Sequence, residues 1–197
     1  LTPEKKYLLS DKAIQAAYDN KLIEVILSSK NNSIKVAYAG FEPSGIFHIG
    51  NYSILANLLY LKSIRIQVYV LISIIHAQLN KKSIDISLLE KNIAYLYDLG
   101  FEKEEIIISS GKNLNIPGTI LERTNQSLLF FHESLEYYKT IMNNISLFKV
   151  NDLYRASTDV VKKSNPLSST NYSILYYPFM QCLDIVFLKV DLAIGGI

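Results

Sequence analysis

Tyr38-Ala-Gly-Phe-Glu-Pro-Ser-Gly-Ile-Phe-His-Ile-Gly-Asn51 carries the clearest fold signal in this sequence. The β-branched and aromatic residues of 34–39 predict a strand that runs into Gly40. The Gly, Pro and Ser residues that follow predict a turn, and residues 48–61 have the periodicity of a helix. Such a strand-to-helix turn can present backbone N–H groups to phosphate. The stretch therefore predicts the start of an α/β domain, in which this turn is either a phosphate-binding loop or an ordinary structural turn.

Residues 64–73 form a nearly continuous apolar run, typical of a strand buried on both faces of a parallel sheet. With the preceding helix and strand they make a βαβ unit with a right-handed crossover. A helix over 84–99 and a strand over 105–109 predict a third unit. The predicted fold class is α/β, a parallel sheet with flanking helices.

Residues 111–169 are less regular, with a helix predicted over 127–142, and we expect a connecting region inserted between sheet strands. A helix over 172–188 and a short strand over 190–194 follow. At the other end, the alternation of apolar and charged residues over 3–30 predicts a helical segment.

A second segment, Tyr177-Pro-Phe-Met-Gln-Cys-Leu-Asp184, places Tyr177, Gln181 and Asp184 on one stripe of the predicted helix, because they stand four and seven positions apart. A buried Asp184 would need a hydrogen-bond donor, and a ligand phenol or ammonium group would serve. The alternative is a surface stripe without a ligand.

Composition narrows the function classes. The chain has 197 residues, of which 49% are hydrophobic and 19% charged, which excludes a disordered chain. A net charge of +2 gives no general electrostatic case for nucleic acid. The single Cys182 excludes an internal disulfide, and no paired Cys/His spacing indicates a protein metal site. With no secretory signal and no membrane-length apolar run, we expect a cytoplasmic protein without membrane contact.

Each of the three histidines is interpreted from its place in the sequence. His48, followed by Gly50 and Asn51, predicts either a ligand-binding helix start or an ordinary cap with a packing glycine. His76 ends the apolar strand, where side chains face a crevice at the sheet edge, although a satisfied core histidine fits equally well. His132 reads as helix surface or subunit contact, without chemistry.

The two quoted segments together resemble the catalytic domain of tyrosyl-tRNA synthetases of the archaeal and eukaryotic kind. Tyr38-x-Gly-Phe-Glu-Pro-Ser-Gly and His48-Ile-Gly-Asn51 resemble that family's first strand and its HIGH element. Tyr177-Pro-x-Met-Gln-x-x-Asp184 and the following Val190-Asp-Leu-Ala-Ile-Gly-Gly196 resemble its substrate helix and next strand. The resemblance implies a Rossmann-like class I synthetase that activates L-tyrosine with ATP and Mg²⁺ and transfers it to tRNA(Tyr).

The resemblance also implies roles for single residues. Tyr38 and Asp184 would hydrogen-bond the phenolic hydroxyl of the substrate, Tyr177 and Gln181 would bind its ammonium group, and His76 would stand at the pocket wall. The ATP side would be lined by Gly40, His48, Gly50 and Asn51. His48 and Asn51 would also assist the phosphates in catalysis. No metal site on the protein is implied.

The implied organisation has four parts: an N-terminal helical segment (1–30), the first half of the catalytic domain (31–111), an inserted connecting and dimerisation region (112–169), and the substrate helix with the next strand (170–197). Family members are homodimers through the inserted region. The family continues into a Gln-Arg-Lys segment and a KMSKS loop beyond the point that corresponds to Ile197, so we expect this sequence to represent the first part of the catalytic domain.

Three departures from the family keep an alternative open. Asn51 stands where a second histidine is frequent, Ile74 stands where aspartate is usual, and the family's Gln-Arg-Lys segment and KMSKS loop are not within this sequence. All three favour a non-catalytic module that binds tyrosine or RNA without making adenylate. Tryptophanyl-tRNA synthetases share the fold, but an indole has no oxygen to accept a hydrogen bond from Tyr38.

Overall fold

The computed structural model describes residues 34–109, 116–129, 131–161 and 172–195. The helical segment predicted for 1–30 lies outside these residues. The polar stretch before the second segment, at 162–170, lies outside them as well.

All four strands pair in parallel in one sheet, in the order β3-β2-β1-β4. The predicted parallel sheet is confirmed, although the last strand is shorter than predicted. The strands are β1 (Val36–Phe41), β2 (Gln67–Ser73), β3 (Ile106–Ser109) and β4 (Leu192–Ala193).

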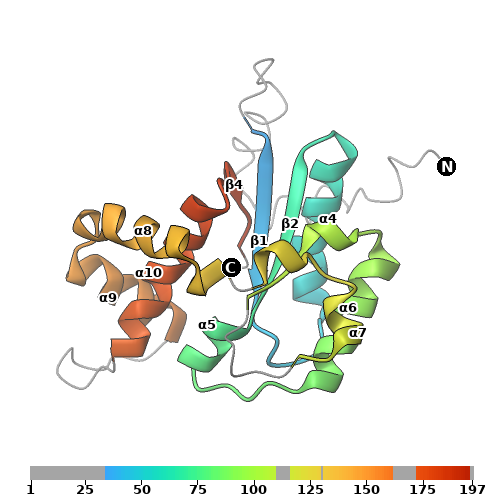
Figure 1. Cartoon of the computed structure of the whole chain (residues 1–197), viewed down its shortest axis with the longest axis horizontal. Helices are drawn as coiled ribbons and strands as arrows, with labels where there is room; N and C mark the ends of the chain where they lie inside the picture. Colours follow the sequence, from blue (N-terminus) through green and yellow to red (C-terminus); the bar gives the residue numbers. More distant parts are fainter. Residues whose placement is uncertain (1–33, 110–115, 130, 162–171, 196–197) are drawn as a thin grey trace.

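Helices connect these strands and cover both faces of the sheet (Figure 1). The α-helices are α4 (Ile49–Ser63), α5 (Ile74–Leu79), α6 (Ile86–Leu99), α7 (Gly118–Leu121), α8 (Leu135–Asn144), α9 (Val150–Val161) and α10 (Tyr172–Phe187). The described residues also contain four short 3₁₀ helices: η1 (Lys103–Glu105), η2 (Gln126–Leu128), η3 (Phe131–Glu133) and η4 (Ile145–Leu147).

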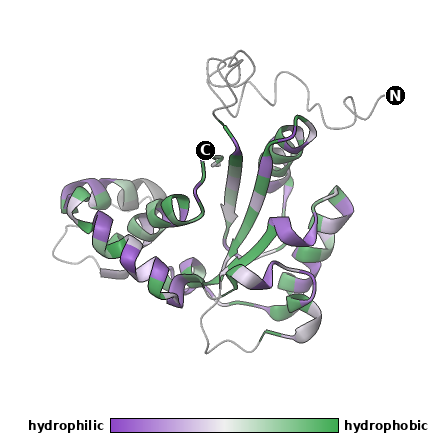
Figure 2. Ribbon diagram, turned by 45° about the horizontal axis from the view of Figure 1, so that its top comes forward, coloured by the Kyte–Doolittle hydropathy of each residue, from purple (hydrophilic) through white to green (hydrophobic). Residues whose placement is uncertain are grey.

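Successive side chains of the strands point to opposite faces, so the sheet has a core on each side. Ala37 and Val70 pack into a core with Leu58 of α4 and Ile93 of α6. Tyr38, Leu71 and Ile107 enter the other core, which α8 and α10 cover. Figure 1 shows α4, α6 and α7 on one side of the sheet and α8, α9 and α10 on the other. The strands between them are largely hydrophobic (Figure 2).

The strand order reverses direction at β1, because β2 lies on one side of it and β4 on the other. In doubly wound sheets ligands bind outside the carboxyl ends of the strands at this switch point. The start of β4 is tied to β1 by Asp191, whose Oδ2 accepts hydrogen bonds from the backbone N–H groups of Lys35 (2.8 Å) and Val36 (3.0 Å). These two bonds lower the pKa of the Asp191 carboxyl.

Two local predictions were wrong, and one helix was missed. His76 does not end a strand: β2 stops at Ser73, and His76 lies in the short helix α5, which the apolar run concealed. The helix predicted over 127–142 begins only at Leu135, because Ser134 caps it by accepting a hydrogen bond from the Tyr137 N–H. Helix α9 was not predicted. No helix in the described part of the chain is both long and apolar enough to span a membrane.

Candidate functional site

A small polar pocket lies at the carboxyl ends of β1 and β2, against α10. Its volume is about 30 Å³. It is lined by Tyr38, Gly40, Phe41, Glu42, Leu71, Ser73, His76, Tyr177 and Gln181. Four of the five residues predicted to contact an amino-acid substrate therefore line one pocket, together with Gly40 from the predicted ATP side.

The predicted stripe on α10 is present. Tyr177 and Gln181 reach the pocket, while Asp184 lies fully buried one turn further along. The ring of Tyr177 meets that of His76 edge to face, with 4.8 Å between the ring centres. Burial raises the pKa of the Tyr177 phenol, and the charge and hydrogen bond of Glu42 raise it further. Tyr177 therefore stays protonated and acts as a donor.

Asp184 obtains donors from its own chain. Its Oδ1 accepts a hydrogen bond from the Tyr137 hydroxyl at 2.8 Å and another from Nε2 of His132 at 2.7 Å. A bound ligand is therefore not needed to explain how this carboxylate is buried. Tyr137, on α8, was not singled out from the sequence, because nothing in an amphipathic helix marks one tyrosine of several as buried.

The reading of His132 as surface or subunit contact was wrong. Its side chain is only 3% exposed, and its ring packs against Phe131 and Tyr137 as well as bonding to Asp184. The 3₁₀ turn η3 turns the histidine inward, whereas a continuous helix had been predicted there. The only sequence signal for His132 was that a buried Asp184 carboxylate would need a hydrogen-bond donor.

His76 faces Asp184 from the other side. Its Nδ1 hydrogen-bonds the Ser73 hydroxyl, which in turn contacts the hydroxyl of Ser109 at 3.2 Å. Its Nε2 lies 3.7 Å from Asp184 Oδ2, and neither atom has a hydrogen-bond partner in the described residues. Burial lowers the pKa of the His76 imidazole.

The phenol of Tyr38 borders the same pocket. Burial raises its pKa, and the nearby charge of Asp184 adds to the effect, so the hydroxyl remains protonated. Its oxygen lies close to Gly40, where a Cβ would stand only 2.9 Å away. Gly40 thus leaves the phenol room to reach the pocket.

The other residues of the predicted ATP side lie at the start of α4 and do not line this pocket. His48 is the N-cap: its Nδ1 accepts a hydrogen bond from the Gly50 N–H, and its own N–H donates to Asn51 Oδ1. Since these bonds use the acceptor atoms, His48 Nε2–H and the Asn51 amide nitrogen remain as outward donors. Two such donors at a helix N-terminus suit an anion.

Glu42 is a pocket residue that the sequence reasoning missed. Its Oε1 accepts a hydrogen bond from Asn80 at 2.6 Å, and its Oε2 is paired with Lys82 at 2.5 Å. It adds a carboxylate to the pocket beside Tyr177. Its place within the quoted Gly-Phe-Glu-Pro turn was the available signal.

Within the described residues, His76, His132 and Asp184 are the one group that brings three potential metal ligands within 4.8 Å of one another. Two of these ligands, His132 and Asp184, are already joined by a hydrogen bond, and Tyr137 donates to the same carboxylate oxygen. Hydrogen bonding therefore accounts for most of the cluster without a cation. The expected absence of a protein metal site stays a prediction.

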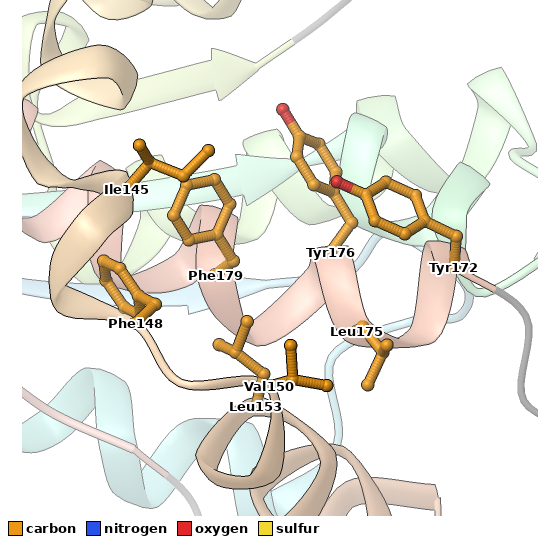
Figure 3. Close-up of a pocket in the computed structure, with 8 residues that line it drawn as sticks. All are labelled: Ile145, Phe148, Val150, Leu153, Tyr172, Leu175, Tyr176 and Phe179. Carbon is orange, nitrogen blue, oxygen red and sulfur yellow. The ribbon is translucent and has the colours of Figure 1, made fainter. Parts of the chain in front are cut away.

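A larger cavity of about 180 Å³ lies between η4, α9 and α10 and shares no lining residue with the polar pocket. Its walls are apolar side chains, among them Phe148, Leu153 and Phe179, with the rings of Tyr172 and Tyr176 at one end (Figure 3). It offers no charged group to bind an amino acid. The polar pocket is therefore the candidate substrate site.

The sequence of this chain is similar to those of known tyrosine–tRNA ligases. The chain is 28% identical over 171 residues to a tyrosine–tRNA ligase of Methanosarcina acetivorans, covering 85% of this chain and 48% of the relative. It thus spans about half the length of the curated relatives it matches.

Solved structures share the fold. Tyrosyl-tRNA synthetase from Archaeoglobus fulgidus, complexed with L-tyrosine, superposes with a TM-score of 0.57 at 23% identity, covering 98% of this chain and 55% of that one. Tryptophanyl-tRNA synthetase from Aeropyrum pernix gives 0.54 at 16% identity, covering 84% and 38%. The fold alone thus does not separate the two substrates.

The family model described as class I tRNA synthetases (W and Y) matches residues 29–197, which include every described element from β1 to β4. Its match spans both quoted segments and the pocket they build. The chain therefore belongs to the class I tRNA synthetases of the W and Y family.

Proposed function

We propose that the protein acts as a tyrosine–tRNA ligase, which joins L-tyrosine to ATP as tyrosyl-adenylate and transfers the tyrosyl group to tRNA(Tyr). The observation that supports this most is the polar pocket, with Tyr38 and His76 on its walls and Asp184 behind them. The curated relative from Methanosarcina acetivorans is a tyrosine–tRNA ligase, in agreement with this substrate.

The pocket offers matching groups for both ends of the amino acid. The Tyr38 hydroxyl and the Asp184 carboxylate serve the phenolic hydroxyl, one as donor and one as acceptor. Tyr177, Gln181 and the nearby Glu42 line the same pocket, and their oxygen atoms serve as acceptors for the ammonium group. Tryptophan is disfavoured because its indole N–H can only donate, which leaves the Tyr38 hydroxyl without an acceptor.

The reaction needs positioning and charge stabilisation, and no nucleophile from the protein. The tyrosine carboxylate attacks the α-phosphate of ATP, and pyrophosphate leaves. His48 Nε2–H and the Asn51 amide N–H donate hydrogen bonds to phosphate oxygens. These donors face the nucleotide because the acceptor atoms of the two side chains, His48 Nδ1 and Asn51 Oδ1, already accept hydrogen bonds at the helix cap. Mg²⁺ bound to the nucleotide would supply further positive charge against the phosphates.

Titration of the chain with L-tyrosine, L-phenylalanine and L-tryptophan tests the substrate. We expect tyrosine to bind at least about tenfold more tightly than phenylalanine, because phenylalanine leaves Asp184 Oδ2 without a donor. Asp184→Asn, which keeps the shape of the side chain, should remove most of that preference. Equal affinity for the three amino acids would refute the proposed substrate.

Exchange of labelled pyrophosphate into ATP tests the chemistry separately. Tyrosine-dependent exchange would establish adenylate formation. Selective tyrosine binding without exchange by the protein containing all catalytic segments would instead establish the non-catalytic binding module. His48→Ala is the matched variant, and it should reduce exchange while leaving tyrosine affinity unchanged, since His48 does not line the amino-acid pocket.

A further inference from the structure

Asp184 presents its two carboxylate oxygens to different surroundings. Oδ1 accepts two hydrogen bonds, from the Tyr137 hydroxyl at 2.8 Å and from His132 Nε2 at 2.7 Å. A carboxylate oxygen has two lone-pair directions, so these donors occupy Oδ1 fully. Burial raises the pKa of the Tyr137 phenol, and Asp184 raises it further, so Tyr137 remains a donor.

Oδ2 is the oxygen left over. Asp184 is fully buried, yet its Oδ2 has no hydrogen-bond partner in the described residues. The facing atom is Nε2 of His76, 3.7 Å away and also without a partner. His76 itself lines the pocket, and the fully buried Asp184 lies directly behind it.

A hydroxyl group fits this pair of atoms. An oxygen that makes two hydrogen bonds of about 2.8 Å can span two atoms separated by 3.7 Å, standing at the apex of the triangle. It would donate to Oδ2 and accept from Nε2–H of His76. An aromatic ring without a hydroxyl would leave both atoms unpaired, at the cost of their desolvation.

We propose that His132 and Tyr137 are positioning residues which occupy Asp184 Oδ1 and thereby leave Oδ2 as the single acceptor for the para-hydroxyl of the substrate. This inference rests on the proposed function and names residues outside the predicted site that set its selectivity. Neither residue touches the substrate. Both act by preventing Asp184 from rotating and from pairing with another donor.

Three variants test the proposal. Tyr137→Phe removes one donor at nearly constant volume, and His132→Leu removes the other. His132→Gln keeps a donor within reach of Oδ1. We expect the ratio of tyrosine to phenylalanine affinity to fall about tenfold in each of the first two and to recover in the third, with phenylalanine affinity little changed. Tyr138→Phe, an exposed neighbour on α8, is the control.

An unchanged ratio in folded Tyr137→Phe and His132→Leu would overturn the proposal, and equal losses in His132→Gln and His132→Leu would do the same. A loss of affinity for both amino acids in parallel would also overturn it, because general damage to the pocket would then explain the result.

A ligand-free measurement keeps the two proposals apart. Imidazole ¹⁵N spectra should show His132 as the Nε2–H tautomer in the wild type, with a marked shift of that proton in Asp184→Asn. If the wild type binds neither amino acid, the proposed function fails, while this spectrum still decides whether His132 holds Asp184. A His132 proton on Nδ1 would refute the positioning role outright.

Discussion

Gly40 shows how one missing side chain shapes the pocket. A Cβ at this position would stand 2.9 Å from the Tyr38 hydroxyl oxygen, and Tyr38 is buried, so the ring has little room to yield. We expect Gly40→Ala to weaken tyrosine binding about tenfold and to cost about 1 kcal/mol of stability. Calorimetry and chemical denaturation measure the two effects.

Gly45→Ala is the matched control, because a Cβ there would meet nothing within 4 Å. It should leave tyrosine affinity unchanged. Equal behaviour of the two variants would show that the Tyr38 phenol does not depend on Gly40.

His76 should make stability depend on pH. Burial lowers its pKa against the partly opposing charges of Asp184 and Glu42, while His132 lowers it further. Because the unfolded chain then takes up the proton more readily, this contribution is fully present above the ordinary histidine pKa of about 6.5 and is lost as pH falls below it. His76→Gln should flatten the curve of unfolding free energy between about pH 7 and 5. A curve with unchanged slope would contradict this.

At the level of elements, Lys62 joins the end of α4 to the turn after α6. Its ammonium group donates to the Gly100 carbonyl at 3.0 Å and pairs with Glu105 at 2.7 Å and Glu102 at 3.1 Å. We expect Lys62→Met to lower the free energy of unfolding by about 1 kcal/mol, measured by urea denaturation, since the Lys62 side chain is only 26% exposed.

The comparison variant is Lys139→Met, which breaks an exposed pair with Glu136 one turn away on α8. Its effect should be close to zero. The pKa of Lys62 is raised because hydrogen bonds and the charges of Glu105 and Glu102 outweigh the opposing effect of burial. The stabilisation therefore persists at neutral pH and is lost only as pH rises through the raised pKa. A loss no larger than that of Lys139→Met would refute the link.

Most elements could be predicted from the sequence because their patterns are local. The apolar runs of β1 and β2 and the periodicity of α4, α6 and α10 each lie within one short window. Helix α5 could not, since Ile74 and Ile75 continue the apolar run of β2, and Ser73, where β2 ends, makes no side-chain capping hydrogen bond. The cap at Ser134 was equally hidden, because serine and threonine are common in that region and only the three-dimensional path selects one of them.

Most of the candidate site could be predicted because its residues share a segment, and the pocket residue His76 was predicted from its place after the apolar run of 64–73. Tyr38, Tyr177, Gln181 and Asp184 stand in two short motifs. His132 and Tyr137 join them through the packing of η3 and α8 against α10, a contact between separate segments that no local spacing encodes. The length of chain between these groups is the physical reason why Asp184 seemed to need a ligand as its donor.

On the scale of the whole molecule, exposed apolar side chains gather over α8, η4 and α9. Leu147 is 74% exposed, Leu135 65% and Val150 57%. We propose that this face supports a homodimer, as the family resemblance implies. Leu147→Glu should shift sedimentation equilibrium toward monomer, whereas Ile49→Glu, 83% exposed at the start of α4, should not. A wild-type protein that stays monomeric at high concentration would contradict the proposal.

The sheet has one weak joint. Strand β1 pairs with β2 over six residues but with β4 over only two, so the Asp191 bonds to Lys35 and Val36 hold much of that edge. Tyr38 belongs to one side of this joint and Asp184 to the segment leading into the other. If this pairing opened, β4 would leave β1 while β1, β2 and β3 remained paired, and the core that Tyr38 shares with Leu183 of α10 would be the contact that keeps Asp184 beside Tyr38. The selectivity of the protein would then depend on this core alone.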